Sequence, residues 1–104
     1  MGKNKDITEL TNLMSIALRH KIGSIVNKED IYAEKYAKDA ENILEEAKKS
    51  SIKQNWSYED RLEIKRQLRK KLLKELMEKV FLDNRKFDIM DEEMNKALKE
   101  LKLS

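Results

Sequence analysis

Cysteine and proline are absent from this sequence of 104 residues, and glycine occurs only twice. Without cysteine the chain has no disulfides, no thiolate metal ligands and no thiol nucleophile. Proline and glycine are the residues that most disfavour helices, so their scarcity favours helix along the whole chain. The lack of cysteine also fits a cytoplasmic protein, and we expect this one to act in the cytoplasm.

Histidine is almost absent too, since His20 is the only one. This chain alone therefore lacks the ligands of an ordinary zinc site, and we expect a structural role for His20 near a helix end. Gly2 and Gly23 stand far apart and form no phosphate-binding loop. Glu63 and Lys65 match a minimal E-x-K nuclease fragment, but they fall within a predicted helix, whereas such nuclease sites need a strand. We therefore expect no enzyme activity, no cofactor and no metal.

Long hydrophobic runs are also missing. No apolar stretch approaches the roughly 18 residues of a membrane-spanning helix, and the first ten residues lack the apolar centre of a secretion signal. We therefore expect no membrane partner. Charged residues make up 41% of the chain and apolar residues 39%, and the apolar ones recur at helical spacing. This composition predicts one domain, residues 1–104, with a modest core and a charged surface.

The positive charge is concentrated in the second half. Residues 1–49 hold nine cations and nine anions, whereas residues 50–104 hold fourteen cations and eleven anions. The whole net charge of +3 therefore comes from residues 50–104. Such an asymmetry is a mild indication of an anionic partner.

The longest helical pattern runs from Ser57 to Phe81. Ser57 and Asp60 have the spacing of a capping box, in which each side chain satisfies a backbone N–H of the other residue. One apolar stripe recurs every four residues and predicts a buried face. Its members are Ile64, Leu68, Leu72, Leu76 and Val80, and we expect Leu62, Leu73 and Met77 to widen it.

Similar patterns predict three more helices and an all-α fold. We expect Gly23 to stop the first helix, Asn27 with Asp30 to open the second, and Asp88 or Asp91 to cap the last. Short links favour antiparallel packing of consecutive helices, as an up-and-down or partly orthogonal four-helix bundle. The predicted helices lie near residues 6–22, 28–49, 57–81 and 89–102. The predicted core includes Leu10, Met14, Ala40, Ile43, Leu68, Leu72, Leu76 and Leu98.

The segment from Lys65 to Lys74 carries six cations and no acid. It is either a solvated face whose long side chains cover the core, or a surface for phosphates or for an acidic partner. The distinction depends on whether Glu41, Glu45 and Glu46 of the second helix lie over it. The candidate contact residues are Lys65, Arg66, Arg69, Lys70 and Lys74.

The end of this helix is the second candidate surface. Because the helix outlasts its neighbours, we expect Met77, Val80 and Phe81 to remain uncovered and to bind a partner. Trp56 precedes the helix and is either an anchor between helices or a base-stacking residue. Tyr32 and Tyr36 lie one turn apart and either close the rim of the core or bind a ligand.

The segment from Ile52 to Leu76 resembles a stretch near the C-terminus of the restriction subunits of type I restriction–modification enzymes. It covers about a quarter of the chain. It departs from the family because the Arg/Leu run lies about two residues later after Trp56, and because no Tyr-Pro-Pro-like segment follows. The residues that carry the resemblance are Ile52, Asn55, Trp56, Glu59, Asp60, Arg61, Arg66, Leu68, Arg69, Lys70, Lys71 and Lys74.

This resemblance implies a helical region that docks a motor subunit onto its modification partner, near DNA, without nuclease or ATPase activity of its own. The leading hypothesis is therefore a helical assembly module that binds a protein partner or itself, in a DNA-processing complex. The alternative is a small nucleic-acid-binding protein that uses the basic helix. A third hypothesis is an enzyme whose site is completed by another subunit.

Overall fold

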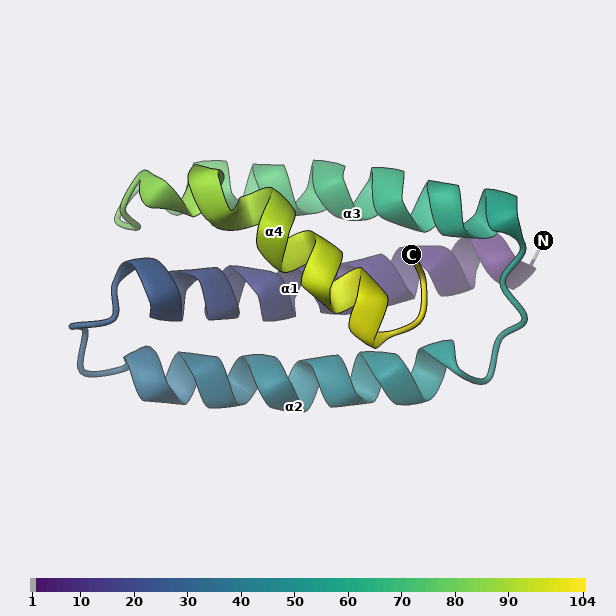
Figure 1. Cartoon of the computed structure of the whole chain (residues 1–104), viewed down its shortest axis with the longest axis horizontal. Coiled ribbons are helices and arrows are strands. Elements are labelled where there is room, and N and C mark those ends of the chain that lie inside the picture. The colour runs from purple at the N-terminus through teal and green to yellow at the C-terminus, as the bar shows by residue number, and fades with distance from the viewer. Residues whose placement is uncertain (1) are drawn as a thin grey trace.

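The computed structural model describes residues 2–104, and this part of the chain folds into four helices with no strand (Figure 1). The observed architecture is the all-α, four-helix bundle that the sequence predicts. None of the helices in residues 2–104 has the length and apolar character needed to cross a membrane. The helices are α1 (Gly2–Val26), α2 (Ala33–Ser51), α3 (Tyr58–Glu78) and α4 (Arg85–Glu100).

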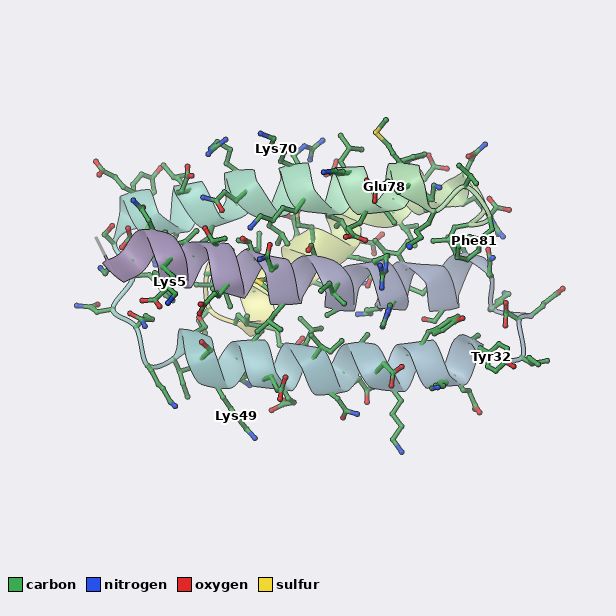
Figure 2. All side chains as sticks on the ribbon, turned by 180° about the vertical axis from the view of Figure 1, so that it is seen from behind. Lys5, Tyr32, Lys49, Lys70, Glu78 and Phe81 are labelled. Atoms are coloured by element: carbon green, nitrogen blue, oxygen red, sulfur yellow. The ribbon has the colours of Figure 1, made fainter. Side chains whose placement is uncertain are left out.

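Helix α1 is the centre of the fold, because each of the other three helices packs against it. Figure 1 and Figure 2 show α2 and α3 on opposite sides of α1, so that the three form one layer. Helix α2 runs antiparallel to α1, whereas α3 runs parallel to it (Figure 1). Helix α4 crosses one face of this layer obliquely and packs on both α1 and α3. The expectation that consecutive helices are neighbours therefore fails for α2 and α3, which α1 separates.

The core lies where α1 meets the other helices. Of the eight predicted core residues, Ile43 is half-buried and packs against the core, and the other seven are buried. Two polar residues of α1 are also buried, Thr11 and Ser15. Their hydroxyls donate to the backbone carbonyls of Ile7 (2.8 Å) and Asn12 (2.9 Å), so each polar group remains satisfied.

A buried ion pair joins α4 to α1. The Glu93 carboxylate of α4 lies 2.9 Å from the Lys21 ammonium of α1 and 3.2 Å from the Lys96 ammonium. Burial works to raise the pKa of Glu93, but the two lysines outweigh it, and the pKa lies below its ordinary value of 4.5. Glu93 is therefore charged at neutral pH, although only 5% of its side chain is exposed.

The start of α3 is fixed by the predicted capping box. The Ser57 hydroxyl accepts from the Asp60 N–H (3.1 Å), and the Asp60 carboxylate accepts from the Ser57 N–H (2.9 Å). Trp56 is half-buried against the core, and its indole N–H donates to the carbonyl (3.2 Å) and hydroxyl (3.1 Å) of Ser51. Trp56 thus anchors the end of α2 to the start of α3. Lys3 adds a further tie, because its ammonium donates to the Asp60 carboxylate (3.0 Å).

Both ends of α1 differ from the prediction. The helix begins at Gly2 instead of near residue 6, and Lys3 in its first turn is held by the bond to Asp60. At the other end α1 continues through Gly23 to Val26, so Gly23 is not a stop. A Cβ at Gly23 would lie 3.4 Å from a methyl carbon of Leu82, in ordinary van der Waals contact, so Gly23 lies where the turn after α3 packs on α1.

The starts of α2 and α4 also differ from the prediction. Asn27 does not open α2, because its side chain bonds to the turn between α3 and α4, accepting from the Asp83 N–H (3.3 Å). Asp30 accepts from the Tyr32 N–H (2.8 Å), and α2 begins only after this turn. Helix α4 begins at Arg85 instead of near residue 89, since Asp83 accepts from the Arg85 N–H (2.9 Å).

Candidate interaction surface

The five predicted basic residues all lie exposed on α3. Figure 2 shows Lys70 projecting from the outer edge of α3, away from α1. The acids Glu41, Glu45 and Glu46 belong to α2, on the opposite side of α1, and therefore do not cover this surface. The basic segment of α3 thus faces outward, and α2 does not cover it.

The two arginines of this segment already have acidic partners. The Arg66 guanidinium donates two hydrogen bonds to the Glu63 carboxylate, at 2.8 and 2.6 Å. The Arg66 and Gln67 side chains lower the pKa of Glu63 to about 2, so Glu63 is ionised at neutral pH. Arg69 forms an ion pair with Asp91 of α4. Neither guanidinium is an unsatisfied cation.

The lysines of α3 differ among themselves. The Lys71 ammonium donates to the Thr8 carbonyl (3.1 Å) and to the Thr11 hydroxyl (2.6 Å), and partial burial lowers its pKa. Lys71 therefore fastens α3 to α1. In contrast, Lys65, Lys70 and Lys74 are exposed and form no ion pair with any residue in 2–104. These three lysines supply the available positive charge of the helix.

A shallow hollow of about 320 Å³ runs along one side of the basic segment. Its lining contains four cations and no acid, so this hollow is positively charged. The lining residues are Arg66, Gln67, Lys70, Lys71 and Lys74.

The three apolar residues proposed to bind a partner are exposed in the single chain. Met77 is 61% exposed, Val80 85% and Phe81 70%. Helix α3 ends at Glu78, so Val80 and Phe81 belong to the following turn and not to the buried stripe in which the sequence pattern placed Val80. Their role in binding a partner stays a prediction.

Two leucines are also exposed, contrary to the predicted buried face of α3. Leu62 is 50% exposed and Leu73 is 38% exposed, although the sequence pattern assigned both of them, with Met77, to a widened buried stripe. At about 100° per residue, Leu62, Leu73 and Met77 fall within roughly 60° of one another around the helix. This group adjoins the Ile64–Leu76 stripe, since Leu76 lies only about 40° from Leu62, and helical spacing alone therefore does not separate the exposed residues from the buried ones.

Aromatic residues gather at the same end of the bundle as Phe81. Tyr32 and Tyr36 have ring centroids 6.3 Å apart, and Tyr36 lies 5.9 Å from the His20 ring. A cavity of about 250 Å³ opens beside them, lined in part by His20, Tyr36, Lys79 and Phe81. Figure 2 shows Tyr32 and Phe81 at this end. Tyr36 therefore lines a small concavity, whereas Tyr32 packs against Tyr36 and is itself exposed.

The surroundings of His20 in this cavity favour its neutral form. An arginine only donates, so the 2.8 Å bond from Arg19 makes Nε2 of His20 an acceptor and places the proton on Nδ1. Burial and then the Arg19 charge lower the pKa of His20 from 6.5, against the opposing effect of Asp39 and Glu75. Arg19 is in turn held by Glu75 at 2.9 Å. His20 thus occupies a structural network that links α1 to α3.

Metal ligands do not converge in the described part of the chain. No group of three or more histidine, aspartate or glutamate side chains within residues 2–104 has the arrangement needed to hold a metal ion. Glu63 and Lys65, the E-x-K fragment, lie on a helix, and Glu63 is engaged by Arg66. The surface features that stand out are therefore the outer side of α3 and the turn that follows it.

Comparison of this chain with protein-family models, with curated proteins and with solved structures finds no match. The resemblance of residues 52–76 to type I restriction subunits therefore rests on the sequence pattern alone and stays a prediction.

Proposed function

We propose that this chain is a helical interaction module that assembles with a protein partner or with a second copy of itself. The observation that carries the proposal is the exposure of Met77, Val80 and Phe81 together at the end of α3. Contiguous apolar surface that a single chain leaves uncovered commonly marks a site of protein association. A module of this kind acts by binding and carries out no chemistry of its own.

The DNA-processing setting belongs to the same proposal. It is supported by the resemblance of residues 52–76, in which the matched helix would join one subunit of a restriction–modification complex to another. In this chain that segment comprises the anchor Trp56 and most of α3, and α3 has an exposed outer side. The segment that carries the resemblance therefore includes much of the outer side of α3, and the exposed Met77, Val80 and Phe81 follow directly after it.

A photo-crosslinking experiment in the native cells tests the assembly function. In the Phe81→p-benzoylphenylalanine variant, the photoreactive side chain replaces an aromatic one that is already exposed. We expect a discrete adduct of defined mass. The matched control is Lys49→p-benzoylphenylalanine, at an exposed position of α2 on the far side of α1. Sedimentation of the purified protein then distinguishes a second copy from a different partner.

The opposite result is equally clear. Two results together would refute the assembly function. Both positions would give the same faint, diffuse adducts, and the purified protein would stay monomeric up to about 0.5 mM. Even weak self-association would be seen at that concentration.

Nucleic-acid binding is the second candidate. It is favoured by the acid-free hollow along α3 and by the exposed ammonium groups of Lys65, Lys70 and Lys74. Neutralisation of phosphates by lysine and arginine makes binding fall steeply with salt, so a salt titration tests this function directly. The chain offers fewer available cations than its sequence suggests, because Arg66 and Arg69 are paired.

A further inference from the structure

The outer face of α3 carries a strip of exposed residues in which Arg66, Arg69 and Lys70 lie between Leu62 and the apolar pair Leu73 and Met77. Leu62, Arg66, Leu73 and Met77 project to the same side, within about 60° at 100° per residue, and this side adjoins the buried stripe, since Leu76 lies about 40° from Leu62. All four are exposed. From Leu62 to Met77 the strip is about 22 Å long at 1.5 Å per residue. This length and narrow width match the contact that one further helix would make.

Positive charge flanks the strip on both sides. Lys70 and Lys74 line the acid-free hollow on one side, and Lys65 lies on the α4 side, where it lines a second hollow with Leu62. None of the three has an ion-pair partner in residues 2–104. Figure 2 shows the Lys70 side chain extended into solvent. A partner that covers the apolar strip must therefore bring its own margins close to uncompensated ammonium groups.

This arrangement selects the chemistry of the partner. A helix with basic margins would place like charges opposite one another, which is unfavourable, whereas acidic margins would form ion pairs at the rim of the contact. Apolar side chains at helical spacing, facing Leu62, Leu73 and Met77, would bury the strip in the way that amphipathic helices enter apolar grooves. Both features belong to an acidic amphipathic helix.

The same observations make a nucleic acid a poorer occupant. A phosphate backbone would leave Leu62, Leu73 and Met77 without apolar contacts. The guanidinium groups of Arg66 and Arg69, which suit phosphates best, are already bound to carboxylates. Only three available ammonium groups remain on this face, too few for steep electrostatic binding.

We infer that the outer face of α3 binds an acidic amphipathic helix of a partner protein. Its apolar side chains cover Leu62, Leu73 and Met77, and its carboxylates pair with Lys65, Lys70 and Lys74. This inference rests on the proposed assembly function and specifies the partner that the function requires.

Fluorescence anisotropy with designed peptides tests the inference. The main probe is a labelled 18-residue peptide, about five helical turns, with leucine at helical spacing and glutamate on both margins. Two peptides serve as references: one replaces every glutamate by glutamine, and the other is a scrambled form of the acidic peptide. We expect the acidic amphipathic peptide to bind at least about tenfold more tightly than either reference, because it combines apolar burial with charge complementarity.

Matched variants assign the binding to α3. Leu73→Gln with Met77→Gln should weaken the main peptide by about tenfold or more, because anchoring apolar contacts are lost. Lys70→Gln with Lys74→Gln should weaken it about fivefold and reduce its dependence on salt. The control is Lys35→Gln with Lys38→Gln, which removes the same charge from exposed positions of α2 and should change nothing. Circular dichroism verifies that each variant is folded.

Several results would overturn the inference. Equal binding of the glutamine peptide would show that charge does not select the partner, and the assembly function would stand. Equal binding of the scrambled peptide would show that binding does not depend on the helical spacing of the leucines. Tighter binding of a duplex DNA, or of phosphatidylserine-containing vesicles, would identify a different class of partner. If no peptide binds at about 1 mM, weaker than any useful docking contact, the inference fails, and the Phe81 crosslinking decides separately on assembly.

Discussion

The two sides of α3 are built from similar residues and have opposite surroundings. On the inner side Ile64, Leu68, Leu72 and Leu76 are completely buried, whereas on the outer side the leucines and Met77 remain 38–61% exposed. The inner residues repeat every four positions and contact α1 and α4, while the outer ones alternate with cations. Residue type is thus no guide to burial in this helix. What separates the buried residues from the exposed ones is their angular position relative to α1.

Truncation of two adjacent leucines should give the largest difference in stability between the inner and outer sides of α3. Leu72→Ala should lower the free energy of unfolding by about 2–5 kcal/mol, because it leaves a cavity in a fully packed core. Leu73→Ala removes the same atoms from the outer side and should cost less than about 1 kcal/mol. Urea denaturation followed by circular dichroism measures both values. Similar losses for the two variants would mean that Leu73 is covered in solution.

A second pair of variants contrasts buried and exposed carboxylates on α4. Glu93→Gln should cost about 1–3 kcal/mol, because the ion pair between Glu93 and Lys21 is lost from a buried position. Glu92→Gln is the matched control, and it should have a much smaller effect because the Glu92 side chain is 66% exposed. The same denaturation measurement applies. Equal effects would show that the Lys21 contact contributes nothing.

The pH dependence of stability sharpens this contrast. The pKa of Glu93 is lower in the folded chain than its ordinary value of 4.5, so the unfolded chain binds the proton more readily. The stabilisation by Glu93 is therefore present above about pH 4.5 and is lost as the pH falls toward the folded pKa. Between about pH 5 and 3, we expect the stability of Glu93→Gln to decline less steeply than that of the unmodified chain. Parallel curves would contradict this assignment.

The smallest expected effects concern the outer cations. With three available ammonium groups, binding to a fluorescent DNA duplex should have a log–log salt slope no steeper than about −2.7, at about 0.9 per phosphate. Lys70→Gln should make the slope shallower by about 0.9, whereas Arg69→Gln should alter it little because Asp91 already holds Arg69. A slope near −4.5 would mean that all five basic residues contact phosphates, and nucleic-acid binding would become the leading function.

The number of helices and the buried stripe of α3 are predictable from the sequence. Helical spacing from Ile64 to Leu76 and the Ser57–Asp60 capping box are local patterns, and the fold preserves them. Several helix ends are not predictable in this way, because contacts between distant residues decide them. Asn27 looks like a helix start, yet its side chain binds the turn at Asp83, which is distant in the sequence.

The candidate surface is predictable only in part. The exposure of the five basic residues follows from their charge, since an unpaired charge is rarely buried. The pairing of Arg69 with Asp91 depends on how α4 crosses α3, which no local pattern specifies. Leu62 and Leu73 are exposed although the sequence pattern places them in the buried face, because the apolar residues of α3 form one wide arc and the sequence does not specify where the cover by α1 and α4 ends.

The layer order α2–α1–α3 has a consequence for local opening. Helix α2 lies at one edge of the layer, and most of its buried residues are small, including Ala33, Ala40 and Ala47. It therefore contributes less apolar contact than α1, which is covered by all three other helices. Regions with few buried apolar contacts open below the global unfolding free energy. Amide hydrogens of α2 should accordingly exchange with solvent before those of α1, through detachment of one edge while the remaining three helices stay packed.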